Sequence, residues 1–170
     1  NMKLKFYFLS MAIWEMLDCN AISVDKIMDN IIKPCPIFEE YRYDIIRSAL
    51  QCFMDKKYVL FSHLIIPQLE NAICNLVEMS GMSVLKFSKK GKGYQLKTLD
   101  DLLRTQPVVD AFTEDGAYYL RLVLTNQLGL NLRNLLCHGI ASPQYFGYSA
   151  AVRLLHVLFM IGAIKEKDNK

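Results

Sequence analysis

Residues 129–139 read Gly-Leu-Asn-Leu-Arg-Asn-Leu-Leu-Cys-His-Gly, an apolar run that polar side chains interrupt. The leucine spacing favours a short helix, which we expect Asn131 to cap at its start and the final glycine to end. Placing arginine, asparagine and histidine among leucines is costly unless each polar side chain finds a hydrogen-bonding partner. The sequence therefore predicts that this helix carries a site held together by polar contacts.

Helical spacing of apolar residues recurs on both sides of this segment. It covers residues 24–32, 45–53, 65–77, 102–112, 119–124 and 148–162. Ser23 and Pro34 mark the start and the end of the first stretch, and Gly116 lies between two later ones. The chain is therefore predicted to be all-α, and we expect the second and third stretches to form two long antiparallel helices.

A short segment near residues 84–96 departs from this pattern. Two apolar runs there flank Gly91 and Gly93, which favours a β-hairpin. Phe87 and Tyr94 lie in these runs. Lysines surround them, because residues 79–99 hold no acidic residue and contain Lys86, Lys89, Lys90, Lys92 and Lys97.

Two interpretations of this lysine-rich hairpin remain open. Lysines that follow a phosphate backbone, with aromatic rings beneath the bases, bind RNA. On this interpretation the RNA-binding residues are Lys86, Lys89, Lys90 and Lys92. The alternative is a solvated hairpin tip whose lysines serve solubility.

The composition is that of a globular protein of one domain's size. The 170 residues suffice for a substantial core, and the hydrophobic content of 52% agrees with one. The net charge of +3 is too small to argue for nucleic acid by itself. The five cysteines are scattered and no histidine is spaced for zinc, so we expect no metal or cofactor and a reduced, cytoplasmic protein. No apolar stretch favours a membrane span.

We expect three parts along the chain. Residues 1–36 predict an N-terminal helical segment that packs on or extends the main domain. Glu15 and Asp18 follow its first apolar run and argue against a signal peptide. Residues 37–164 form the main domain, and residues 165–170 form a polar tail.

The motif segment carries a resemblance to a known family. Arg133 and His138 form Arg-x-x-x-x-His with Asn134 directly after the arginine, which resembles the HEPN superfamily of nucleases. More narrowly, Arg-Asn-x-x-x-His-Gly resembles one HEPN branch named only as a domain of unknown function. Residues 65–71, Ile-Ile-Pro-Gln-Leu-Glu-Asn, look like the second helix of that branch. The resemblance covers residues 39–162.

The resemblance implies a fold, an assembly and an activity. The fold is an up-and-down bundle of about four core helices, here with extra N-terminal helices. The assembly is a homodimer through the face that carries the motif. The activity is metal-independent cleavage of RNA that leaves a cyclic phosphate and a 5′-hydroxyl, as in RNA degradation, toxin or antiviral defence systems. A regulatory domain or partner can accompany such domains.

The side chains of the motif suit these implied roles. The imidazole of His138 can take a proton from a ribose 2′-hydroxyl or give one to the leaving oxygen. The guanidinium of Arg133 can bind phosphate oxygens while negative charge builds on them. Asn134 can fix the tautomer of His138 or position the phosphate. We expect Glu70 to orient Arg133 or His138, and Asn131 to support the helix.

One geometric difficulty and two alternatives accompany this hypothesis. A regular helix places Arg133 and His138 about 140° apart, so either His138 lies at a frayed helix end or two chains together supply the working pair. The first alternative is a structural cluster in which Arg133 pairs with an acid. The second is a catalytically inactive HEPN module that binds nucleic acid or dimerises within a larger protein.

Overall fold

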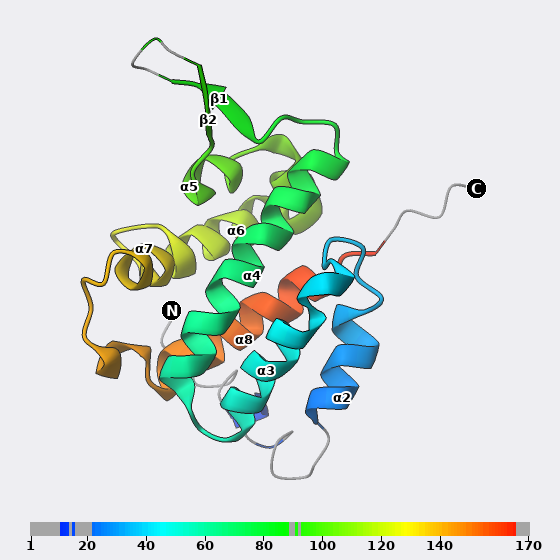
Figure 1. The fold of residues 1–170 in the computed structure, drawn as a ribbon, viewed down its shortest axis with the longest axis vertical. Coiled ribbons are helices and arrows are strands. Elements are labelled where there is room, and N and C mark those ends of the chain that lie inside the picture. The colour runs from blue at the N-terminus through cyan, green and yellow to red at the C-terminus, as the bar shows by residue number, and fades with distance from the viewer. Residues whose placement is uncertain (1–10, 14, 16–21, 89–90, 92, 166–170) are drawn as a thin grey trace.

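Helices form almost the whole of the computed structural model, which describes residues 11–13, 15, 22–88, 91 and 93–165 (Figure 1). The elements are α2 (Val24–Ile27), the π-helical turn η1 (Met28–Ile32), the 3-10 turn η2 (Glu40–Arg42), α3 (Tyr43–Met54), α4 (Tyr58–Met79), β1 (Leu85–Phe87), β2 (Tyr94–Leu96), α5 (Leu99–Leu102), α6 (Gln106–Leu124), α7 (Leu132–Cys137), the 3-10 turn η3 (Pro143–Phe146) and α8 (Tyr148–Gly162). The predicted all-α class is confirmed.

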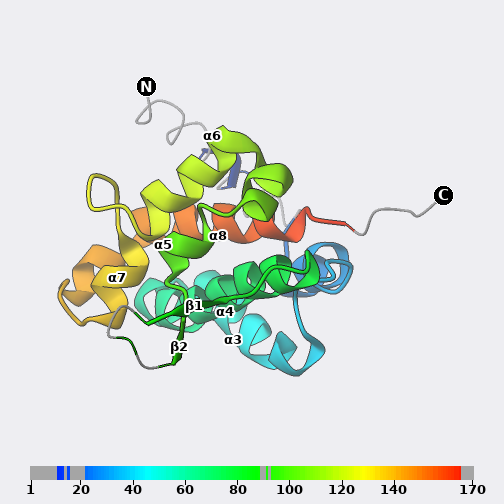
Figure 2. The ribbon, with the colours of Figure 1, turned by 90° about the horizontal axis from the view of Figure 1, so that it is seen from above.

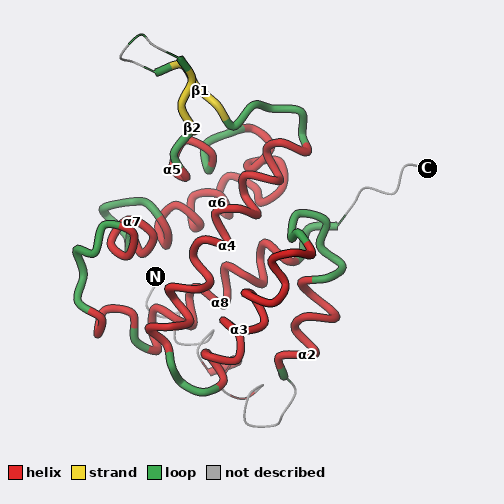
Figure 3. The backbone as a smooth tube through the Cα atoms, in the orientation of Figure 1, coloured by secondary structure: helices red, strands yellow, loops and turns green. Residues whose placement is uncertain are grey.

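Helix α4 lies at the centre of the bundle. It packs against α3, α8, α5, α6 and η3, and it runs antiparallel to α3 (Figures 1 and 3). A helix with neighbours on several sides must be apolar on several faces. The buried apolar side chains of α4 accordingly form a wide stripe along it: Phe61, Ile65, Ile66, Leu69, Ala72, Ile73 and Val77.

The N-terminal elements pack on the same core. The Ser23 side chain accepts a hydrogen bond from the Lys26 amide at 3.2 Å and so begins α2 as predicted. The helix continues as the π-helical turn η1 and contacts α3 and α8. The contact with α8 is close, since a Cβ atom on Gly162 would lie 2.2 Å from Cγ2 of Ile31.

The predicted hairpin is confirmed. Strands β1 and β2 pair antiparallel, with Leu85 opposite Leu96 and Phe87 opposite Tyr94. Helix α5 follows directly, and Thr98 and Asp101 begin it with a capping box, in which each side chain accepts a hydrogen bond from the other's backbone amide. The hairpin projects beyond the helical body (Figure 1).

The break in helix α6 lies at a different residue from the one predicted. The sequence places a break at Gly116, but the backbone leaves helical geometry at Thr113, with φ 65° and ψ 167°. The Thr113 hydroxyl then accepts a hydrogen bond from the Gly116 amide at 3.3 Å. Thr113 therefore acts as the cap that restarts the helix, and the glycine lies inside the restarted part.

Three further properties of the described residues concern a membrane-spanning helix, disulfides and a metal site. Within those ranges no helix has both the length and the apolar character needed to cross a membrane. The cysteines at positions 35, 52, 74 and 137 are free thiols. No three His, Cys, Asp or Glu side chains of the same residues gather closely enough to hold a metal ion.

The loop between α6 and α7 folds back on the end of α6. The Leu130 amide donates to the Leu122 carbonyl at 2.7 Å, and the Gly129 amide donates to the Asn126 carbonyl at 2.9 Å. A Cβ atom on Gly129 would lie 2.1 Å from the Leu122 carbonyl oxygen, so only glycine fits. This close approach sets where α7 begins.

Replacing Gly129 with alanine tests that constraint. We expect Gly129→Ala to lower the free energy of unfolding by roughly 1–3 kcal/mol, because the backbone must move to accommodate the methyl group. Gly147→Ala is the matched control, since a Cβ atom there would meet the Gln144 carbonyl at 3.4 Å and φ is −74°. Urea denaturation of both variants measures the difference. Equal stabilities would contradict the close approach.

Candidate functional site

The motif segment (residues 129–139) forms the short helix α7 and both of its ends. Asn131 occupies the N-cap position, but its backbone is left-handed, with φ 51° and ψ 32°. Its side chain does not cap the helix and instead accepts a hydrogen bond from the Asn134 side-chain amide at 2.8 Å. The predicted position of Asn131 at the start of the helix is confirmed, but the predicted hydrogen bond between its side chain and the helix backbone is wrong. Asparagine suits the position because it tolerates the left-handed conformation better than most residues.

The end of α7 is built as predicted. Gly139 is left-handed, with φ 62°, and its amide donates to the Leu136 carbonyl at 3.0 Å. The Ile140 amide donates to the Leu135 carbonyl at 3.0 Å. These two bonds define a Schellman motif, in which glycine avoids the cost that a Cβ atom brings. His138 is consequently the C-cap residue, at the last position of the helix.

Arg133 and Glu70 form a bidentate ion pair between α7 and α4. Nε of Arg133 donates to one carboxylate oxygen and Nη2 to the other, each at 2.9 Å. Both side chains are only 24% exposed. The hydrogen bonds to Glu70 raise the pKa of the Arg133 guanidinium above its ordinary value. Of the two partners expected for Glu70, the structure therefore places Arg133 beside it.

The ion pair does not use the whole guanidinium. Nη1 of Arg133 donates to the Asn134 side-chain oxygen at 3.2 Å, so three of the five N–H donors are engaged. One donor on each terminal nitrogen has no hydrogen bond to a described residue. A phosphate group accepts hydrogen bonds from such a pair of donors.

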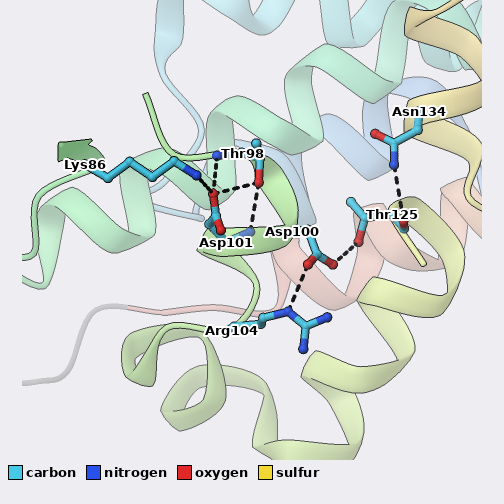
Figure 4. Close-up of polar contacts among 7 residues, drawn as sticks. All are labelled: Lys86, Thr98, Asp100, Asp101, Arg104, Thr125 and Asn134. Atoms are coloured by element: carbon cyan, nitrogen blue, oxygen red, sulfur yellow. Dashed lines mark hydrogen bonds and ion pairs between the residues drawn. The ribbon is translucent and has the colours of Figure 1, made fainter. Parts of the chain in front are cut away.

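Asn134 connects the motif segment to the end of α6 and to α5. Its side-chain amide donates to the Thr125 carbonyl at 3.2 Å. The Thr125 hydroxyl donates to Asp100 at 2.9 Å, and Asp100 also accepts from Arg104 at 2.9 Å (Figure 4). The Asn134 side chain therefore positions Arg133 and α7, and its hydrogen bonds do not reach the His138 side chain.

His138 lies apart from this network. Its imidazole is exposed, and no hydrogen bond or ion pair joins the ring to another described residue; only the backbone amide of His138 is bonded, to the Asn134 carbonyl at 3.1 Å within the helix. Arg133 reaches towards α4 while His138 stands at the solvent-exposed end of α7. Within one chain, no hydrogen bond therefore joins the side chains of the two motif residues.

Of the four lysines predicted to bind RNA, the structure describes Lys86. Lys86 forms an ion pair with Asp101 of α5 (Figure 4), which attaches the hairpin to the bundle, and its part in RNA binding stays a prediction. Its hydrogen bond, together with those from Thr98, lowers the pKa of Asp101 to about 2. Lys89, Lys90 and Lys92 lie outside the described residues.

Two residues that support the site, Thr125 and Tyr145, were not predicted from the sequence. Thr125 is a buried polar residue at the end of α6 that links Asn134 to Asp100. The Tyr145 hydroxyl donates to the Leu130 carbonyl at 3.2 Å and so supports the loop before α7. Only the polar character of Thr125 between apolar stretches could have indicated it, because its partners are distant in sequence.

Comparison with known proteins gives no match to the chain, whether against family models, curated proteins or solved structures. The HEPN resemblance therefore rests on the motif residues and on residues 65–71.

Removal of the ion pair gives a stability test of the site. We expect Glu70→Ala to lower the free energy of unfolding by about 1–3 kcal/mol, because Arg133 then keeps a largely buried charge without its partner. The loss in Glu70→Ala/Arg133→Ala should be smaller than the sum of the single losses. Urea denaturation measures this double-mutant cycle.

Glu78→Ala is the control for that cycle, because Glu78 is an exposed carboxylate on the same helix. Its stability should match the parent within about 0.5 kcal/mol. Strictly additive losses for Glu70 and Arg133 would contradict an energetically coupled pair.

Proposed function

We propose that this chain is a metal-independent endoribonuclease of the HEPN type. One observation carries the proposal: an arginine fixed by a bidentate carboxylate keeps two N–H donors that no described residue accepts, on a helix that ends in an exposed imidazole. A permanent cation with available donors, and an imidazole that can act as general base and general acid, are what phosphodiester cleavage by a 2′-hydroxyl requires.

The reaction follows from these two groups. An imidazole takes the proton of the ribose 2′-hydroxyl, and the oxygen attacks the adjacent phosphorus. The guanidinium binds the non-bridging oxygens as negative charge builds on them. The bond from phosphorus to the 5′-oxygen breaks, and the imidazolium gives its proton to that oxygen. The products are a 2′,3′-cyclic phosphate and a 5′-hydroxyl, and no step of this proposed reaction needs a metal or cofactor.

The working site is a composite of two chains in this proposal. Within one chain Arg133 faces α4 and His138 faces solvent, so a second copy must supply the complementary group. Two large apolar side chains beside the motif are unusually exposed, Leu128 at 94% and Ile140 at 71%. Their burial would favour a two-fold dimer through this face.

The second candidate is a catalytically inactive HEPN module that binds nucleic acid or dimerises. The observation that favours it is the pairing of Arg133 with Glu70, which neutralises the cation locally. Lys89, Lys90 and Lys92 would then supply most of the attraction to phosphates, as they would in the nuclease. The free thiols of the described cysteines are in keeping with a cytoplasmic location for either candidate.

An RNA-cleavage assay in excess EDTA separates the two candidates. The parent should cleave single-stranded RNA to cyclic-phosphate ends, whereas Arg133→Ala and His138→Ala should each lower the rate by roughly 10²- to 10⁴-fold. His63→Ala is the matched control, because His63 is also exposed but its Nδ1 is hydrogen-bonded to the Val59 carbonyl within α4. RNA binding without cleavage would support the inactive module, and normal cleavage by His138→Ala would refute the nuclease.

Mixing two inactive variants tests the composite site. A dimer of Arg133→Ala with His138→Ala has one site that keeps both an arginine and a histidine, provided that the two residues come from different chains. We expect an equimolar, re-equilibrated mixture to recover roughly a quarter of the parent activity, since half of the dimers are mixed and each has one of two sites. A mixture as inactive as its components would place both groups of each site on one chain.

A further inference from the structure

The hairpin presents an apolar face that the other described residues leave exposed. Opposed residues of an antiparallel pair have side chains on the same face, so Leu85, Phe87, Tyr94 and Leu96 share one face. Their exposed fractions are 44%, 75%, 65% and 70%. So many exposed large apolar side chains on such short strands indicate a binding surface.

The opposite face attaches the hairpin to the bundle. Lys86 lies there, opposite Gln95, and pairs with Asp101 of α5. The Lys97 amide donates to the Val84 carbonyl at 2.8 Å, which closes the base of the hairpin. The apolar face is therefore directed away from the ion pair between Lys86 and Asp101. The hairpin is attached to the bundle through its other face, and the apolar face stays exposed although this attachment is made.

The two aromatic rings on this face form one continuous surface. The ring centroids of Phe87 and Tyr94 are 4.6 Å apart, and the ring planes differ by 34°. Base–aromatic stacking needs such an exposed ring face, and it tolerates any base because each has a π-face.

Size and charge decide between possible occupants. A stable protein interface needs roughly 800 Å² from each partner, which two three-residue strands do not provide alone. The sequence around them carries five lysines and no acidic residue over residues 79–99, so a second copy would be repelled and a polyanion attracted. The occupant that fits both features is a flexible polyanion with flat apolar groups.

Helix α5 fixes this face relative to the motif segment. Two adjacent carboxylates of α5 make separate contacts (Figure 4). Asp101 forms an ion pair with Lys86 of the hairpin. Asp100 accepts a hydrogen bond from the Thr125 hydroxyl, and the Thr125 carbonyl accepts one from Asn134. In Figure 1 the hairpin projects from the upper end of the bundle and α7 lies lower, on its left flank, with α5 between them, and Figure 2 shows the same elements from above. Helix α5 therefore connects the hairpin to the candidate site.

We propose that the hairpin face of Leu85, Phe87, Tyr94 and Leu96 binds the bases of single-stranded RNA, with Phe87 and Tyr94 as the stacking residues. The inference rests on the proposed function for the identity of the nucleic acid, and it names unpaired RNA as the substrate class. A duplex does not fit, because its bases are stacked on each other and only its backbone and grooves are accessible.

Binding is measured with a fluorescent single-stranded 2′-O-methyl oligoadenylate, which has no free 2′-hydroxyl and cannot be cleaved by the proposed reaction. Phe87→Leu/Tyr94→Leu removes both rings but keeps the face apolar and the charge unchanged. We expect its affinity to fall roughly tenfold or more, with the salt dependence preserved. Binding of the same oligonucleotide annealed to its complement should not change.

Two further variants control for loss of the hairpin itself. Phe87→Trp keeps a ring, so its affinity should equal or exceed that of the parent, and the new indole fluorescence should be quenched by the single strand and not by the duplex. Tyr41→Phe/Tyr118→Phe alters exposed aromatic residues elsewhere and should bind like the parent.

Unchanged affinity in Phe87→Leu/Tyr94→Leu, or no quenching with Phe87→Trp, would overturn the inference. A second outcome would also overturn the inference: the parent does not bind RNA, and both the parent and the leucine variant self-associate. The face would then be assigned to contacts between protein chains. Loss of binding in the leucine variant with no cleavage by the parent would refute only the nuclease, whereas cleavage with unchanged binding would refute only the stacking face.

Discussion

The ion pair between Glu70 and Arg133 is the contact on which the geometry of the candidate site depends. Helix α7 has six residues, too few to be stable without tertiary contacts. Leu132 supplies a buried apolar contact at its first turn, and the bidentate pair joins its Arg133 side to α4, the central helix. Because α4 packs against most of the bundle, the position of the guanidinium is set by the core itself.

The same polar network explains the division of roles within the motif. Arg133 and Asn134 have their side chains committed to Glu70, Thr125 and each other, and Asn131 uses a left-handed backbone to complete the cluster. His138 is left outside this cluster by the Schellman motif that ends the helix. A fixed cation and an exposed imidazole are thus the consequence of where a six-residue helix begins and ends.

Features that depend on neighbouring residues were mostly predicted correctly from the sequence. The partners of side chains that are distant in the sequence were not. Helical periodicity, the Ser23 cap, the hairpin and the end at Gly139 depend on neighbouring residues, so the sequence sufficed. Whether Glu70 would meet Arg133 or His138 depended on packing across 63 residues, and Lys86 paired with Asp101 once strand register turned it towards α5. The break at Thr113 eluded prediction because a β-branched residue is an unfavourable place for a left-handed φ. The HEPN assignment, which no known protein tests, stays a prediction.

The closed base of the hairpin has a consequence for evolution. The chain leaves the bundle after α4 and returns at α5, and the bond between the Lys97 amide and the Val84 carbonyl joins the two passages. The turn that joins β1 to β2 can lengthen, shorten or be exchanged without altering the helical core. The Asp100–Asp101 pair lacks that freedom, because each carboxylate has a separate partner. Homologous chains should therefore diverge in the projecting loop while keeping this acidic doublet.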